Sequence, residues 1–192
     1  MSALWLALHF PLLALEAEHG PRPEPRVLVR ANRVLLANPA ARAAGVEAGL
    51  RLGTARALCE TLEVHEARAD QQHQALLREA RQLLALTPQV CPAPPATVLL
   101  EVGGCLKLFG GFKPLLARVD RYRLHCPLTS RLGIGPTPLA AWHLTDPPPL
   151  DAPPEAARFQ AWLADLPLAE LDLDERLRRR LQAPGFRTLG EL

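Results

Sequence analysis

Residues 3–10, with the sequence ALWLALHF, are apolar at almost every position. The even-numbered positions are leucine or phenylalanine, and the odd-numbered positions include Trp5, Ala7 and His9. A strand with two mostly apolar sides is typical of the centre of a sheet that is covered on both faces. Pro11 has no backbone N–H and cannot continue a central ladder, so the strand should end there. This segment therefore predicts a central strand inside a layered fold.

The following segments alternate between extended and helical patterns. RVLVR at 26–30 and RVLLA at 33–37 bracket Ala31-Asn32 and predict a hairpin, and 39–59 predicts short helices broken by glycines. Further strands are expected at 62–66, 97–102 and 130–135. Longer helices are expected from a cap at Asp70 to about Leu86, over 112–125 and over 138–144, with a rigid loop at 91–96, CPAPPA. This order predicts an α/β (α+β) fold around a split βαβ sheet.

The proline-rich stretch DPPPLDAPP at 146–154 predicts a linker and a domain boundary. Helical patterns follow at 155–166 and 174–182. Gly185 suits the residue just after a helix, and Thr188 suits the cap of another helix. We therefore expect a small second helical domain that is truncated soon after Thr188.

Charge and cysteine content exclude some classes of protein. The 192-residue chain has a formal net charge of +2, so a nucleic-acid site would have to be a local basic patch. Its four cysteines show no CxxC pair and no histidine at zinc spacing, which favours reduced cysteines in a cytosolic protein. No apolar run approaches the ~20 residues of a membrane span, and no signal peptide is evident. We expect a cytoplasmic protein without a membrane partner.

Five segments, in chain order, resemble parts of the Y-family translesion DNA polymerases (UmuC/DinB-like). They are WLALHFPLLALEA at 5–17, LANPAARAAGVEAGL at 36–50, VLLEVGG at 98–104, RLGIGPTPLAAWHL at 131–144, and residues 163–192. The resemblance implies a palm at 1–20 and 76–150, with a fingers-like insertion at 21–75. It also implies a truncated helix–hairpin–helix-like thumb at 151–192 and no little finger.

The segments that resemble the metal-binding motifs lack their carboxylates. In this resemblance the first metal-binding aspartate of the palm is replaced by Ala7, and the later Asp-Glu pair falls on Ala96 and Thr97. Two-metal phosphoryl transfer needs such carboxylates to hold Mg²⁺. Glu101 matches a family position that is not a metal ligand, and His9 is expected to be a hydrogen-bonded sheet histidine. We predict no catalytic residue, no bound metal and no cofactor.

The nucleotide pocket implied by the resemblance is altered as well. The tyrosine that binds the triphosphate corresponds to Pro39, whereas its arginine partner corresponds to Arg42. The aromatic gate against ribose falls on Leu12, and two lysines of the later motif fall on Pro138 and Trp142. Arg42 either retains a contact with a phosphate or pairs with a nearby carboxylate such as that of Glu47.

These departures are typical of ImuB-like proteins, the catalytically inactive Y-family relatives of bacterial mutagenesis cassettes. LALHFPLLALE and LEVGGCLKLFGG resemble that subgroup in particular. The resemblance implies a noncatalytic adaptor in damage-induced mutagenesis (the SOS response), located in the bacterial cytoplasm and recruited to the nucleoid. Its implied partners are primer–template DNA, the sliding clamp, an error-prone C-family polymerase and a RecA-like ImuA-type protein. Most of these partners are expected to bind through regions beyond this chain.

A basic cluster in the thumb-like region is the candidate DNA contact. It consists of Arg178, Arg179, Arg180 and Arg187. Helix–hairpin–helix units hold the DNA backbone through main-chain N–H groups and basic side chains. Pro184 removes one such N–H group, and neighbouring acidic residues would also suit an exposed helix face.

Two other functions remain open. The chain could be an active Y-family polymerase that uses other acids, namely Glu16, Glu18 and Glu101, although these are not expected to converge within the ~4 Å of a two-metal site. It could also be a protein-interaction module with no affinity for DNA. The basic cluster in the thumb-like region separates this last possibility from the adaptor.

Overall fold

The computed structural model describes residues 3–18, 20–148, 150–171 and 173–192. A four-stranded sheet has the order β5 (Val90–Ala93), β6 (Thr97–Glu101), β1 (Trp5–His9) and β7 (Arg131–Gly135), with every neighbouring pair antiparallel. β6 and β7 are joined through α5 (Phe112–His125) and flank β1 on either side. This is the predicted split βαβ arrangement, and the predicted α/β fold class is confirmed.

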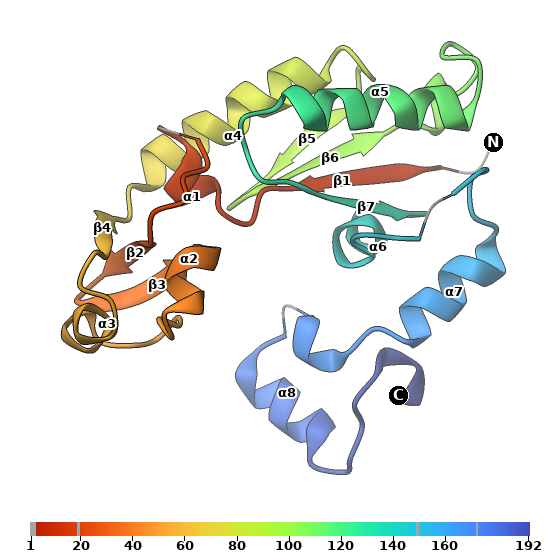
Figure 1. The fold of residues 1–192 in the computed structure, drawn as a ribbon. Coiled ribbons are helices and arrows are strands. Elements are labelled where there is room, and N and C mark those ends of the chain that lie inside the picture. Colours follow the sequence, from red (N-terminus) through yellow and green to blue (C-terminus); the bar gives the residue numbers. More distant parts are fainter. Residues whose placement is uncertain (1–2, 19, 149, 172) are drawn as a thin grey trace.

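β1 is covered on both faces, as its two apolar sides predict. α4 (Ala69–Leu83) and α5 lie over one face of the sheet, and the short α6 (Pro138–His143) lies over the other (Figure 1). Leu6 and Leu8 point into the main core under α4 and α5, while Ala7 packs on the α6 side. The main core also contains Phe10, Leu76, Leu83, Leu100, Leu115, Val119 and Ile134.

A separate three-stranded sheet follows α1 (Leu13–Glu16). Its order is β3 (Arg33–Ala37), β2 (Arg26–Arg30), β4 (Glu63–Glu66), with β2 and β3 antiparallel and β2 and β4 parallel. Ala31 and Asn32 both have positive φ, as a two-residue hairpin turn requires, so the predicted hairpin is confirmed. α2 (Pro39–Ala43) and α3 (Leu52–Leu58) close a second core on one face of this sheet.

Two local predictions are wrong. Residues 90–93 form β5 and pair with β6 instead of forming part of a rigid loop. Pro92 is compatible with this strand because β5 lies at the edge of the sheet, where one side of the backbone needs no partner. The second error concerns α4, which begins at Ala69 without a side-chain cap, so Asp70 lies in its first turn and does not cap it.

The C-terminal helices are α7 (Ala156–Ala164), the short η2 (Leu168–Glu170), α8 (Glu175–Gln182) and η3 (Leu189–Glu191). Thr188 and Glu191 form a capping box at η3, which confirms the predicted cap at Thr188. Phe159 of α7 is buried in the main core, so these helices are anchored to the four-stranded sheet. Within the described residues, no helix combines the length and the apolar character needed to cross a bilayer.

Candidate functional site

The positions expected to carry metal ligands meet on the four-stranded sheet. Across β1 and β6, Ala7 is opposite Leu99, and His9 is opposite Thr97. Because side chains alternate along a strand, these four share the face that α6 covers. Ala7 and Thr97 are both 0% exposed. Ala96, just before β6, packs in the main core on the opposite side.

Apolar groups fill this face around Ala7. Its side chain contacts Leu99 and Ala141, with Trp142 packed beside them. Two glycines of β7 let the backbone of α6 lie directly on the sheet: a Cβ added at Gly133 would be 1.9 Å from the carbonyl oxygen of Ala141. The helix therefore covers the part of the sheet where the resemblance implies metal-binding carboxylates.

His9 lies two residues after Ala7, on the same face of β1. Its Nδ1 is 2.9 Å from Oγ1 of Thr97, and the two are hydrogen-bonded. Burial, reinforced by the positive charge of Arg131 on β7, lowers the pKa of His9 below its usual value. His9 is therefore neutral at neutral pH, and the expectation of a hydrogen-bonded sheet histidine is confirmed. Arg131 itself pairs with Asp146, at 2.6 Å from Nε to Oδ2.

These residues do not fit a pair of Mg²⁺ ions. Magnesium takes hard oxygen ligands, chiefly carboxylates, whereas this face offers one imidazole and one hydroxyl that bond to each other. Across the part of the chain that the structure describes, no group of three or more histidine, cysteine, aspartate or glutamate side chains could hold a metal.

The acids considered as substitutes are engaged elsewhere or exposed. The carboxylate of Glu101 accepts hydrogen bonds from three backbone N–H groups around the end of β6. Glu16 accepts two from Thr129, one from the backbone N–H and one from the hydroxyl, both at 2.7 Å. Glu18 is exposed just after α1. Glu16 thus ties the end of α1 to the distant segment at Thr129, and Glu101 fixes the turn after β6 and the start of β1.

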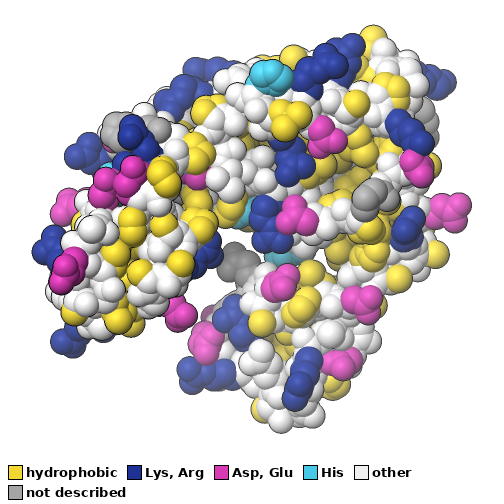
Figure 2. Space-filling model, in the orientation of Figure 1, with side chains coloured by type: hydrophobic (Ala, Val, Ile, Leu, Met, Phe, Trp, Pro, Cys, Tyr) yellow, Lys and Arg dark blue, Asp and Glu magenta, His cyan; other side chains and the backbone are white. Residues whose placement is uncertain are grey.

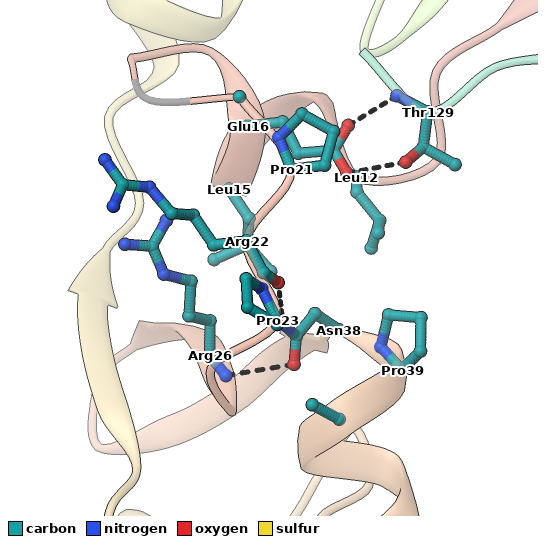
Figure 3. Close-up of a pocket in the computed structure, with 12 residues that line it drawn as sticks. Leu12, Leu15, Glu16, Pro21, Arg22, Pro23, Arg26, Asn38, Pro39 and Thr129 are labelled. Carbon is teal, nitrogen blue, oxygen red and sulfur yellow. Dashed lines mark hydrogen bonds between the residues drawn. The ribbon is translucent and has the colours of Figure 1, made fainter. Parts of the chain in front are cut away.

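Of the positions implied in nucleotide binding, Leu12 and Pro39 line one cavity, whereas Arg42 and Trp142 do not line it. Arg42 is exposed on α2 and makes no ion pair with Glu47. Pro39 is the first residue of α2, and Leu12 is buried just before α1. Both line a small cavity between the two sheets (Figure 3). Trp142 packs beside Ala7, on the other side of the molecule's main sheet from α5.

The four candidate DNA-contacting arginines differ in their surroundings. Arg178 donates to Glu175 and to the backbone carbonyls of residues 171 and 173, so it holds the turn before α8 in place. Arg179 also pairs with Glu175, at 2.8 Å, but stays exposed. Arg180 and Arg187 are exposed as well. The hairpin after α8 turns at Gly185, which has a φ of +103°.

A cleft of about 1,070 Å³ lies between the four-stranded sheet and the C-terminal helices. His9, Arg131 and Arg178 line it, together with Trp142. On the face seen in Figure 2, lysine and arginine side chains are scattered and form no continuous basic surface. The sequence predictions did not include Arg131. The pattern of β7 alone does not show that Arg131 faces His9, because that depends on the register of two distant strands.

The sequence matches a protein family model over residues 13–146, described as IMS, the impB/mucB/samB family. Comparison with curated proteins gives no significant match.

Solved structures of DNA polymerases share this fold. The insertion ternary complex of Dbh DNA polymerase aligns with a TM-score of 0.77 and 19% identity, over 98% of this chain and 59% of that one. DinB from Sulfolobus solfataricus aligns with a TM-score of 0.73 and 21% identity, over 98% and 59%. At these identities the likeness establishes the fold. The chain spans about three fifths of the length of either structure.

Proposed function

The chain belongs to the impB/mucB/samB family, and we propose that it is a noncatalytic Y-family polymerase-like module acting in translesion DNA synthesis. One observation carries the proposal: Ala7 and a hydrogen-bonded His9–Thr97 pair occupy the face where the family resemblance implies metal-binding carboxylates. An alanine methyl group cannot coordinate a cation. One threonine hydroxyl cannot replace two carboxylates in stabilising the attacking and leaving oxygens of phosphoryl transfer.

In this proposal the chain is an adaptor. It brings an error-prone C-family polymerase, together with a RecA-like ImuA-type protein, to the sliding clamp at damaged DNA in the bacterial nucleoid. Support comes from the ordered resemblance of five segments to Y-family polymerases, and from LALHFPLLALE and LEVGGCLKLFGG, which resemble the inactive subgroup in particular. Residues 1–20 and 76–150 would be the palm, 21–75 the fingers and 151–192 the thumb.

The DNA contact of the module is assigned to the thumb. Arg179, Arg180 and Arg187 are exposed and available to phosphates, while Arg178 chiefly positions α8 through its bonds to backbone carbonyls. A protein-interaction module without DNA affinity is the second candidate. The observation that favours it is that Arg178 and Arg179 already pair with Glu175.

Metal binding tests the loss of catalysis directly. We would add Mn²⁺ to the ¹⁵N-labelled chain and follow paramagnetic broadening of amide signals. The wild-type chain should show no localised broadening near Ala7 and Thr97. Weak broadening at exposed carboxylates such as Asp120 and Asp151 gives the internal reference for non-specific binding of Mn²⁺. Specific broadening at β1 and β6 in the wild type, or templated nucleotide addition by it, would refute the proposal.

DNA binding separates the two candidate functions. Fluorescence anisotropy with a primer–template should show an affinity that falls linearly with the logarithm of salt concentration, because phosphate contacts release counterions. The double variant Arg179→Glu, Arg180→Glu should bind about tenfold more weakly or worse and show a shallower salt slope. Arg121→Glu, an exposed change on α5, is the control. No binding by the wild type at low salt would favour the protein-interaction module, whereas equal binding by all three proteins would show that the basic cluster is not the DNA contact.

A further inference from the structure

A cavity of about 260 Å³ lies at the junction of the two sheets, between α1, the loop at 20–23, β2 and α2 (Figure 3). We propose that it is a docking pocket for a partner protein segment that places a bulky apolar side chain inside it, next to a carboxylate. The proposal rests on the adaptor function, since it gives the adaptor a defined contact with a partner. The pocket is separate from the β1–β6 face, because neither Ala7, His9 nor Thr97 lines it.

The walls of the pocket are mainly apolar. Leu12 and Leu15 form one side, and three prolines with Ala40 supply much of the rest. At about 260 Å³ the pocket is smaller than the roughly 300–1,000 Å³ typical of sites for drug-sized ligands. A single large side chain is the group that suits this size, as in interfaces where one anchor fills a desolvated pocket.

Hydrogen bonds hold the pocket open in a fixed shape. Oδ1 of Asn38 accepts from the backbone N–H of Arg26 at 2.9 Å and of Ala41 at 3.0 Å, and Nδ2 donates to the carbonyl of Glu24 at 2.8 Å. On the opposite side, both oxygens of Glu16 accept from Thr129 (Figure 3). A rigid pocket loses little conformational freedom when a ligand binds.

The side chains at the pocket that could attract a charged ligand are positively charged. Arg26 is 93% buried, since its side chain is 7% exposed, and its Nε donates to Glu63 at 2.7 Å. Its Nη1 is buried and has no hydrogen-bond partner among the described residues. Arg22 is exposed, and in Figure 3 its guanidinium extends to the same side as that of Arg26. Both oxygens of Glu16 are already used, and Nη1 of Arg26 is enclosed by protein. The exposed guanidinium of Arg22 is therefore the accessible group that complements a carboxylate.

Short peptides of defined sequence test this chemistry. The probe would be acetyl-Gly-Phe-Asp-Asp-Gly-amide, titrated into the ¹⁵N-labelled chain while amide shifts are followed. Shifts should concentrate at Arg26, Asn38 and Thr129. Replacing the phenylalanine of the probe by alanine, or both aspartates by lysine, should weaken binding about tenfold or more.

Variants of the chain provide matched controls. Ala40→Leu fills the pocket and should weaken binding of the peptide about tenfold, whereas Ala43→Leu, on an exposed position of the same helix, should not. Arg22→Glu should weaken binding, whereas Arg30→Glu, an exposed arginine at the end of β2, should leave it unchanged. The pocket variants should retain the DNA affinity of the wild type.

Three outcomes would overturn the proposal: shifts that map outside the pocket, equal binding of the acidic and basic peptides, or competition by Mg²⁺-dNTP, which would make the cavity a nucleotide site. These results are independent of the metal and primer–template assays. Failure of the docking pocket can therefore be distinguished from failure of the adaptor function.

Discussion

Replacing Gly133 with alanine tests whether α6 lies directly on the four-stranded sheet. An added Cβ would be 1.9 Å from the carbonyl oxygen of Ala141, 3.1 Å from its carbonyl carbon and 3.2 Å from the carbonyl oxygen of Leu144. All three atoms belong to the backbone, so rotation of a side chain cannot relieve the contact. Either α6 or β7 must move.

The expected cost follows from what that movement disrupts. Inserting a methyl group into a packed core typically costs about 1–3 kcal/mol. Here the displacement would also strain the bond from the N–H of Ile134 to the carbonyl of Leu144, 3.1 Å long, and loosen the fully buried Ala141. We expect a loss near the upper end, about 3 kcal/mol in the free energy of unfolding. For a chain of this size that corresponds to a fall in Tm of roughly 6–12 °C.

Urea and thermal denaturation followed by circular dichroism measure this loss. Gly53→Ala is the matched control, because Gly53 lies in α3 and a Cβ there meets nothing within 4 Å. It should stabilise the protein by up to about 1 kcal/mol. The reasoning fails if Gly133→Ala costs less than about 1 kcal/mol and leaves the amide signals of α6 in place.

Three further changes have defined outcomes. Tyr122 donates a hydrogen bond to the buried carboxylate of Glu79, so Tyr122→Phe should cost about 1.5–3 kcal/mol in urea denaturation at pH 8. Burial and Glu79 raise the pKa of Tyr122, so its stabilising contribution should be present below about pH 10 and be lost progressively above it. Between about pH 9 and 11 the Tyr122→Phe variant should therefore lose less stability than the wild type does. Asn38→Ala removes the cap of α2 and the acceptor for Arg26, and should cost about 2 kcal/mol or more by the same method, whereas Asn38→Asp should cost less. The pKa of His9 is lowered, so its stabilising contribution should be present above about pH 6.5 and be lost as the pH falls. NMR titration of His9 should place its midpoint below about pH 6.5. His9→Gln should reduce the loss of stability that the protein shows as the pH falls below that value.

Elements with strong local signals were predicted from the sequence. The hairpin at Ala31-Asn32 and the helix at 112–125 both form where their patterns indicate, because turn chemistry and helical periodicity act over a few residues. β5 was missed for the opposite reason. A cysteine–proline segment has little strand propensity of its own and becomes a strand only by pairing with β6.

The types of side chain at the candidate site could also be predicted from the sequence. Ala7 and Thr97 fall in segments whose strand character is evident, and Ala96 directly precedes the second of them, so the absence of carboxylates there did not depend on the fold. The hydrogen-bond and ion-pair partners of individual charged residues could not be predicted from the sequence. The sequence pattern predicts Arg178 as a DNA contact, but its guanidinium donates hydrogen bonds to backbone carbonyls five and seven residues away.

The sequence by itself determined most strands and helices and the chemical groups that they carry, because these depend on residue type and short-range pattern. Only the tertiary structure decided that α6 covers Ala7 and that Thr129 fixes Glu16, 113 residues away. The pocket that contains Arg26 likewise exists only in the fold, where segments from residues 12 to 129 meet. Such contacts depend on strand register and on packing between distant segments, and no local pattern encodes either.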